Sequence, residues 1–323
     1  MHTVLITGVG AIIGYGAVRS LRKSRDDVRV VGMDIYPDAV GQVWCDAFEV
    51  ATPAADPGYV AFLADLIRKH HIALVIPAIE QDVLRMSRER QPLAQTGARF
   101  ALNTPELIAT AHDKWLMHNR LSDAGVPTIP TAIDGTFADL AGRFGLPFVV
   151  KPRRSYASKG LVHVKTEDDY RYWRSRLGDE LMAQQLVGDD GAEYTVGAFG
   201  LGDGSVTAKI VLRRTLARDG STAKAWVCAL PDLEAAVDAL AALFRPVGPT
   251  NFQFRRDRDA CLLLEINPRV SSSTSIRAAF GSSDAEMCVE YFLEGRTPAP
   301  RPVRSGFAVR YIEDVITFDR DRF

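Results

Sequence analysis

The hydrophobic pattern of the first hundred residues alternates between short apolar runs and longer amphipathic stretches. An apolar run at residues 2–7 leads into a glycine turn, and residues 12–24 then place apolar side chains at helical spacing. A second apolar run ends at Asp34, residues 59–71 are patterned as a helix, and a further strand begins at Ile72. Strands that alternate with helices in this way predict an open parallel sheet covered on both faces.

The pattern becomes mixed beyond residue 103. Residues 104–131 predict two short helices, and residues 147–152 and 161–166 predict two strands joined by a basic hairpin tip at 153–160. More strands and a helix over 232–244 precede a last hairpin at 251–269. This order predicts an α+β architecture after the parallel sheet.

The last hairpin gathers oxygen-bearing side chains on one face, because side chains two apart on a strand point the same way. With a three-residue loop at residues 258–260, Gln253 lies opposite Glu265 and Asn251 lies opposite Asn267. A hard cation, Mg²⁺ or Mn²⁺, satisfies such a set, whereas softer metals require His or Cys. The alternative, a buried hydrogen-bonded cluster, leaves the charge of Glu265 unpaired.

Three cations suit an anion near this hairpin. Arg269 follows Asn267 by two residues and carries the planar fork that binds phosphate. Lys114 stands near a helix start, where a cation is electrostatically unfavourable, and Lys151 ends a buried-type strand. Taken alone, Lys114 can also be interpreted as an ordinary exposed lysine, and the basic tip at 153–160 as an ordinary solvated loop. Metal, arginine and lysines together predict a polyphosphate site for ATP.

Four motifs follow one another along the chain: "HDKWLMHNRLSDAGVPTIP", "LPFVVKPRRSYASKG", "MAQQLVGDDGAEYTV", and "NFQF" followed by "LLLEINPRVSSSTS". The set resembles the ATP-grasp superfamily, and most closely the ATP-binding halves of the carbamoyl phosphate synthase large chain, as small stand-alone ligases. The resemblance covers nearly the whole chain. It implies an open parallel, Rossmann-like pre-ATP-grasp α/β domain at 1–108, then an ATP-grasp fold of two α+β subdomains at 109–185, which carries the lid, and 186–323, which carries the metal site.

The resemblance also implies roles for individual residues. The lid loop would run from Arg153 to Gly160, Gln184 to Leu186 would form the adenine hinge, and Glu193 would hold the ribose. The implied nucleotide-binding residues are Lys114, Lys151, Ser155, Gly160, Gln184, Gln185, Leu186 and Glu193. The implied metal ligands are Gln253, Glu265 and Asn267, and the implied catalytic residues are Arg269, Arg214 and Arg218. The chain departs from the family in having one glycine in the lid and glutamines where a hinge glutamate is common.

The activity implied is an ATP- and Mg²⁺-dependent ligase. A carboxylate would be activated as an acyl phosphate and joined to an amine, with release of ADP and phosphate. Arg214, Arg218 and Arg277 would suit anionic substrates such as amino acids. Glu80 ends a predicted parallel strand, where ligands gather in open sheets, and is a candidate acceptor or nucleotide contact or simply a helix N-terminal charge.

Two other functions fit parts of the sequence. An NAD-dependent oxidoreductase would use Gly8, Gly10, Gly14 and Asp34, although the glycines are spaced GxGxxxG rather than GxGxxG. It leaves the C-terminal oxygen cluster unexplained. A non-catalytic ATP sensor of the same fold would bind nucleotide without acceptor-dependent turnover.

Composition limits the kinds of partner and the cellular location that we expect for the protein. The 323 residues carry a formal net charge of −1, so no global field favours nucleic acid. The four cysteines are far apart and no apolar run reaches the roughly 18 residues of a membrane span, which predicts a cytoplasmic protein without membrane contact. The tail at 310–323 alternates apolar and polar residues, which favours a strand that covers the core or contacts a second copy in a homodimer.

Overall fold

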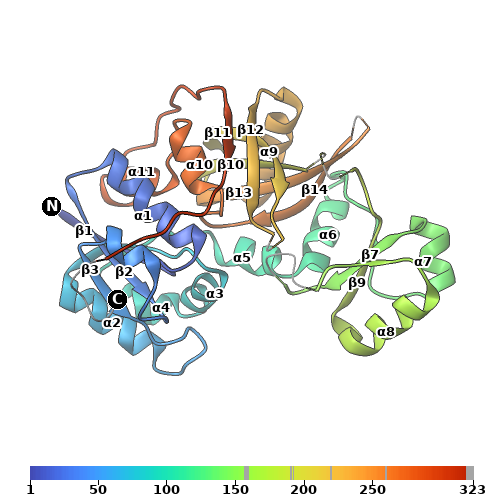
Figure 1. The fold of residues 1–323 in the computed structure, drawn as a ribbon, viewed down its shortest axis with the longest axis horizontal. Helices are drawn as coiled ribbons and strands as arrows, with labels where there is room; N and C mark the ends of the chain where they lie inside the picture. Colours follow the sequence, from blue (N-terminus) through green and yellow to red (C-terminus); the bar gives the residue numbers. More distant parts are fainter. Residues whose placement is uncertain (156–159, 190, 192, 219, 259, 318–323) are drawn as a thin grey trace.

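The computed structural model describes residues 1–323 except 156–159, 190, 192, 219, 259 and 318–323. Three sheets follow one another along the chain (Figure 1). The predicted combination of a parallel α/β part with α+β parts is confirmed, while the domain boundaries at 108 and 185 stay a prediction. No helix in the described part of the chain is long and apolar enough to cross a membrane.

The first sheet is parallel throughout, and its strand order is β3-β2-β1-β4-β5. Its strands are β1 His2–Thr7, β2 Val28–Asp34, β3 Ala47–Val50, β4 Ile72–Ile76 and β5 Arg99–Phe100. Its helices are α1 Ile12–Ser24, α2 Tyr59–His70, α3 Glu80–Arg88 and α4 Arg90–Ala94, with a short 3-10 turn at Val40–Trp44. The strand order reverses between β1 and β4, so the segments after these two strands meet at a topological switch point, where open α/β sheets bind ligands.

The second sheet forms a lobe at one end of the molecule, drawn in green in Figure 1. It is antiparallel in the order β6-β9-β7-β8, with strands β6 Thr131–Ala132, β7 Phe148–Pro152, β8 Val162–Val164 and β9 Leu181–Gln184. Helices α7 Phe137–Phe144 and α8 Glu167–Leu177 begin with capping boxes, and a 3-10 turn at Gly178–Glu180 leads into β9. Phe144, Phe148 and Tyr170 form the aromatic core of this lobe.

The third sheet is antiparallel and has six strands in the order β14-β13-β10-β11-β12-β15. They are β10 Glu193–Leu201, β11 Val206–Leu216, β12 Thr222–Cys228, β13 Val247–Asp257, β14 Ala260–Asn267 and β15 Phe307–Val309. Helix α9 Pro231–Phe244 covers one face together with α5 Pro105–His112 and α6 Lys114–Asp123. Helices α10 Thr274–Ala279 and α11 Asp284–Cys288, followed by a π-helical turn Val289–Leu293, connect it to the first sheet.

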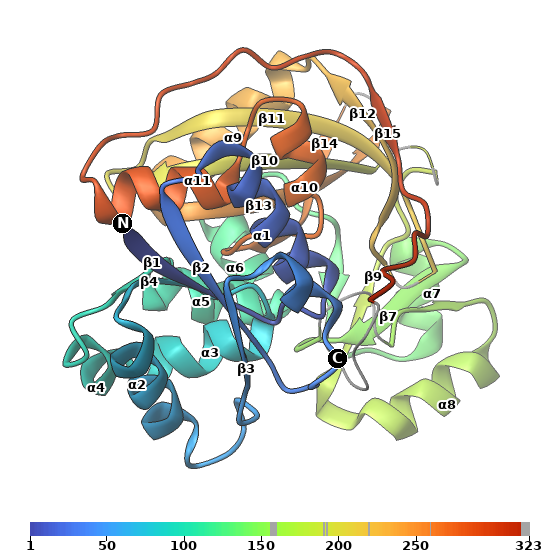
Figure 2. The same ribbon diagram turned by 60° about the vertical axis from the view of Figure 1, so that its left-hand side comes forward.

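Helix α1 joins the first and third sheets. Its buried residues Val18 and Leu21 share one core cluster with Phe199 of β10 and Ala285 of α11. In Figure 2, α1 lies beside α10 and α11 in front of the third sheet. This packing brings the switch point of the first sheet close to the end of β14.

The C-terminal hairpin has the predicted register near its open end, but its turn and its strand pairing near the turn differ from the prediction. Asn251 pairs with Asn267 and Gln253 with Glu265, as predicted. The predicted three-residue loop is wrong, because Asp257 pairs with Ala260 and the turn is one residue shorter. A β-bulge compensates: Phe254 pairs with Leu263, so Leu264 is the extra residue.

The prediction of a strand in the tail is also wrong for its described part. The strand at this end of the chain is β15, Phe307–Val309, which pairs with β12, and residues 310–317 follow without regular structure. Arg310 anchors the start of this segment, since its backbone N–H donates to Ala223 O at 2.9 Å and its Nη1 to Thr222 O at 2.6 Å.

Candidate active site

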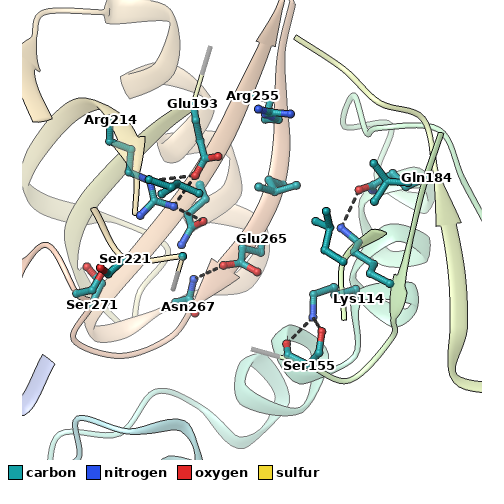
Figure 3. Close-up of a pocket in the computed structure, with 18 of the residues that line it drawn as sticks. Lys114, Ser155, Gln184, Glu193, Arg214, Ser221, Arg255, Glu265, Asn267 and Ser271 are labelled. Carbon is teal, nitrogen blue, oxygen red and sulfur yellow. Dashed lines mark hydrogen bonds and ion pairs between the residues drawn. The ribbon is translucent and has the colours of Figure 1, made fainter. Parts of the chain in front are cut away.

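The three sheets enclose a cavity of about 750 Å³. Its lining includes every predicted site residue except Gly160 and Arg218: Lys114, Lys151, Ser155, Gln184, Gln185, Leu186, Glu193, Arg214, Gln253, Glu265, Asn267 and Arg269. Figure 3 shows Glu265 and Asn267 on one wall, facing Lys114 and Ser155 across the space. Residues far apart in sequence therefore form one concave surface, as expected of a ligand site.

The oxygen-bearing wall is the open end of the β13–β14 hairpin. Asn267 Nδ2 donates to Glu265 Oε1 at 3.0 Å, and Gln253 Oε1 accepts from Arg214 Nη2 at 2.7 Å. Burial raises the pKa of Glu265, but Lys114, the Asn267 amide and Lys151 outweigh it and leave that pKa below its ordinary value. The carboxylate is therefore held ionised.

No ion pair involves Glu265 among the described residues, although this carboxylate is only partly exposed and lines the cavity. A charge in that position favours a cation from outside the chain. Gln253 and Asn267 contribute amide oxygens beside it, so the donor set suits Mg²⁺ or Mn²⁺. The described residues contain no cluster of three His, Cys, Asp or Glu side chains that could hold a metal ion. A metal here would therefore be held by Glu265, by these amide oxygens and by oxygen atoms of a bound molecule.

Two lysines occupy the facing wall. Lys114 is the first residue of α6, and its Nζ donates to Ser155 O at 2.5 Å and to Ser155 Oγ at 3.2 Å. Lys151 lies on β7 and donates to Gln184 Oε1 at 2.8 Å. Burial lowers the pKa of both lysines, and with the added repulsion of Lys114 it brings the pKa of Lys151 to about 7. Both cations are thus poorly solvated and suited to an incoming polyanion.

Arg214 on β11 is more constrained than the sequence suggested. Its Nε and Nη2 both donate to Glu193 Oε1, at 3.0 and 2.6 Å, and its Nη1 donates to Thr222 Oγ1 at 3.3 Å. The side chain of Arg214 is 4% exposed and that of Glu193 8%. Arg214 therefore holds Glu193 and Gln253 in place. A substrate contact for Arg214 and a ribose contact for Glu193 stay predictions.

Arg269 links the hairpin to the first sheet. Its Nε donates to Glu80 Oε2 at 2.9 Å and its Nη2 to Asn267 Oδ1 at 3.1 Å. Glu80 begins α3 directly after the β4 loop, and its other oxygen lies 3.9 Å from His112 Nδ1. The sequence pointed to both Glu80 and Arg269 but contained no signal that they form a pair.

The hinge segment borders the cavity next to β9. The Gln185 backbone N–H donates to Pro130 O at 3.0 Å, and the Gln184 side chain lies between Lys151 and Thr131. Gln184 thus fixes Lys151 and is itself fixed by Thr131 Oγ1 at 3.1 Å. Both ends of the Gln184 amide therefore have hydrogen-bond partners, as a buried polar group requires.

The predicted lid is held at its first residues by a carboxylate. Asp113, the N-cap of α6, accepts from Arg153 at 2.7 Å and pairs with Arg154 at 3.0 Å. Both arginines belong to the basic tip predicted from the sequence, and the structure pairs them with Asp113. Gly160 lies outside the cavity lining, and residues 156–159 of the lid are outside the described residues.

Two more arginines do not reach the cavity. Arg218 is exposed in the turn between β11 and β12 and is not among the lining residues. Arg277 was expected to suit an anionic substrate, but it is 1% exposed and pairs with Asp284 at 2.5 Å. It also donates to Asn251 Oδ1 at 3.0 Å, so its role is to join α10 to β13 and α11.

The N-terminal glycine turn is engaged in its own structure. Asp34 accepts from the Gly10 backbone N–H at 2.7 Å and from that of Tyr36 at 3.1 Å. A Cβ on Gly14 would lie 2.1 Å from Gly8 O, so this glycine lets α1 approach β1. Asp34 therefore closes the turn where a dinucleotide site would leave it free for ribose.

Several lining residues were missed by sequence reasoning. Ile12, Ile13 and Ile79 line the end formed by the first sheet, and Arg255 and Leu264 line the wall formed by the hairpin. The spacing of Arg255, two residues after Gln253, was a usable signal for its shared face. Leu264 reaches the cavity wall at a bulge, which no pattern indicated.

Two segments of the chain match known protein families. Residues 4–101 match the family described as "PylC-like, N-terminal domain", and residues 179–315 match "ATP-grasp in the biosynthetic pathway with Ter operon". Formate-dependent phosphoribosylglycinamide formyltransferase of Burkholderia cenocepacia is 30% identical over 178 residues, covering 52% of this chain and 40% of that protein. The carbamoyl phosphate synthase large chain of Mycobacterium bovis is 28% identical over 196 residues, covering 55% of this chain and 17% of that protein.

Solved structures share the fold across nearly the whole chain. N5-carboxyaminoimidazole synthetase from Staphylococcus aureus, complexed with ADP, superposes with a TM-score of 0.74 at 19% identity, covering 94% of this chain and 80% of that one. The L-amino acid ligase from Bacillus licheniformis gives 0.71 at 14% identity, covering 91% and 74%. The chain spans less than half the length of the curated relatives it matches. The two matched segments, residues 4–101 and 179–315, confirm the resemblance drawn from the motifs, and the solved structures show the fold.

Proposed function

This chain carries an ATP-grasp domain behind a PylC-like N-terminal domain, and from that premise we propose that it is an ATP- and Mg²⁺-dependent ligase that joins a carboxylate to an amine. The observation that carries the proposal is Glu265. It is an ionised, partly buried carboxylate with no ion-pair partner among the described residues, and it faces two desolvated lysines across the cavity. A magnesium-bound polyphosphate satisfies both walls at once.

The nucleotide would be held by residues from all three parts of the cavity. Lys114 and Lys151 would contact its phosphates, and Gln253, Glu265 and Asn267 would hold Mg²⁺. The hinge at Gln184–Leu186 would take the adenine, with Glu193 at the ribose. The relatives' printed names support this assignment, since one neighbour of the same fold is described as complexed with ADP.

The first step forms an acyl phosphate. A carboxylate oxygen of the substrate attacks the γ-phosphorus in line, a new O–P bond forms, and the bond between the γ-phosphorus and the ADP oxygen breaks. Bound Mg²⁺ supplies Lewis-acid stabilisation of charge on the phosphate oxygens. Lys151 and Arg269 add positive charge at fixed positions, and Asn267 orients the Arg269 fork.

The second step forms the amide. The amine nitrogen attacks the acyl carbon, a C–N bond forms, the C–O bond to phosphate breaks, and the amine proton leaves with phosphate or solvent. No protein nucleophile is required, so the chain contributes binding and orientation. The end of the cavity lined by Ile12, Ile79 and Glu80 lies at the topological switch point and is the proposed place for the acceptor.

Acyl phosphate trapping tests this activity without knowledge of the amine. The protein is incubated with ATP, Mg²⁺, hydroxylamine and a panel of carboxylates that includes the amino acids, and ADP and hydroxamate are measured. We expect a carboxylate that supports both products, and a loss of both with Arg269→Ala. Arg256→Ala is the matched control, because Arg256 pairs with Asp232 on the other face of β13.

Two outcomes would contradict the ligase. Binding of MgADP without hydroxamate from any carboxylate would favour the nucleotide sensor. Binding of NADH without MgADP would favour the oxidoreductase, which the closed Asp34–Gly10 turn does not support.

Three further predictions accompany this function. A cytoplasmic location is supported by the four cysteines, all free thiols in the structure. A homodimer stays a proposal, supported by the exposed apolar residues Phe307, Tyr311 and Ile312 near the C-terminus. The division into 1–108, 109–185 and 186–323 is supported by one sheet in each range.

A further inference from the structure

Arg255 stands on the nucleotide wall of the cavity, at the end away from Arg269. It shares a strand face with Gln253 and pairs across the sheet with Glu193. Two residues of strand displace it about 7 Å from Gln253, toward the hairpin turn. A ligand whose phosphates lie at Gln253 and Glu265 would therefore extend past Arg255.

The contacts of Arg255 place it at the hinge end of the cavity. Its Nη2 donates to Asp189 O at 3.1 Å, directly after the hinge, and Gly188 and Asp189 line the same cavity. Figure 3 shows Arg255 high on the hairpin wall, on the same side of the cavity as Glu193, with Gln184 across from it. The guanidinium is anchored at one corner by a backbone carbonyl and remains beside the open space.

The cavity that Arg255 borders has apolar as well as charged side chains in its lining, and the apolar part suits a flat uncharged ring. Ile129, Val149, Leu186 and Leu264 line the cavity as apolar side chains. Arg255 makes no ion pair within the described part of the chain, and its Nε is buried without a hydrogen-bond partner. A guanidinium plane in such a place stacks favourably on an aromatic ring.

We propose that Arg255 lays its guanidinium on the face of the nucleobase and is a determinant of nucleotide affinity, in a site whose existence rests on the proposed function. The base would lie between Arg255 and the apolar side chains of the lobe. The hinge backbone would read the edge of the base, while Arg255 contributes affinity through its face.

Binding of MgADP and of magnesium tripolyphosphate, measured by calorimetry on the full chain, separates a base contact from a phosphate contact. We expect Arg255→Ala to weaken MgADP binding about 5- to 30-fold and to leave tripolyphosphate binding within about twofold. Arg255→Lys keeps the charge but loses the plane, so we expect it to show most of the same loss. Arg256→Ala removes the same charge from the opposite face of β13 and should bind both ligands as the wild type does.

The possible results are distinguishable. Wild-type affinity for MgADP in both Arg255 variants would overturn the stacking proposal while leaving the ATP site intact. Equal weakening of MgADP and tripolyphosphate in Arg255→Ala, with recovery in Arg255→Lys, would assign Arg255 to the phosphates and also overturn it. Failure of the wild-type chain to bind either ligand would instead overturn the proposed function.

Discussion

Arg269 and Glu80 form an ion pair at 2.9 Å although they stand 189 residues apart. The pair joins the end of the β13–β14 hairpin to the segment after β4, at the switch point of the first sheet. It holds the Arg269 fork, which also donates to Asn267, beside the proposed metal ligands. The N-terminal domain thus contributes to the geometry of the site, beyond forming one of its walls.

We expect Glu80→Ala to lower turnover about tenfold or more, because Arg269 loses its position while keeping its charge. MgADP affinity should change little, because Arg269 is proposed to act on the transferring γ-phosphoryl group, which ADP lacks. Hydroxamate formation and calorimetry measure the two quantities. The double variant with Arg269→Ala should be no worse than Arg269→Ala alone, and additive losses would show that Glu80 acts independently of Arg269.

The buried Lys151 predicts a pH-dependent stability. Burial and the nearby Lys114 lower the pKa of Lys151 to about 7, against an ordinary 10.5. Between these values the unfolded chain binds a proton that the folded chain does not, so this group makes the folded state less stable as pH falls from 10.5 to 7. Lys151→Met removes the effect.

The melting temperature of ligand-free Lys151→Met should therefore exceed that of the wild type by roughly 5 °C or more at pH 7. The difference should shrink steadily at pH 8.5 and pH 10. Circular dichroism melts at the three values measure it. A difference that is constant with pH would show that Lys151 keeps an ordinary pKa in the folded chain.

Arg277 and Asp284 form a buried pair whose role is structural. Their side chains are 1% and 2% exposed. We expect Asp284→Ala to lower the free energy of unfolding by about 3–5 kcal/mol, because Arg277 is left charged and unpaired. Asp238→Ala breaks the more exposed pair with Lys209 and should cost less than about 1 kcal/mol. Equal effects in denaturant titrations would contradict a buried pair.

The sequence predicted those parts of the fold that depend on local pattern. Alternating apolar blocks indicated the parallel sheet, and period-two placement brought Gln253 opposite Glu265. The bulge at Leu264 was missed, because an extra residue in a strand leaves no periodic signal when the residues before it, here 261–263, are all apolar.

Ion pairs between residues far apart in the sequence were the other feature that the sequence did not predict. Arg277 looked like a substrate contact, and nothing in its neighbourhood along the chain pointed to burial against Asp284 and Asn251. The same holds for Glu80 with Arg269, because sequence separation carries no information on which charges meet after the domains pack. The candidate site could be predicted as a set of residues, and its electrostatic partners could not.

Thermal unfolding with a non-hydrolysable ATP analogue, with and without Mg²⁺, is the most direct test of the central claim. The wild-type chain and Glu265→Gln are compared, with NADH as a separate ligand. At about 100 times its dissociation constant the analogue should add roughly 2.7 kcal/mol of stability to the wild type. We expect a shift that requires Mg²⁺ and is weakened in Glu265→Gln. A shift that is independent of Mg²⁺ and unchanged in the variant, or one produced by NADH alone, would contradict the proposed ATP–metal site.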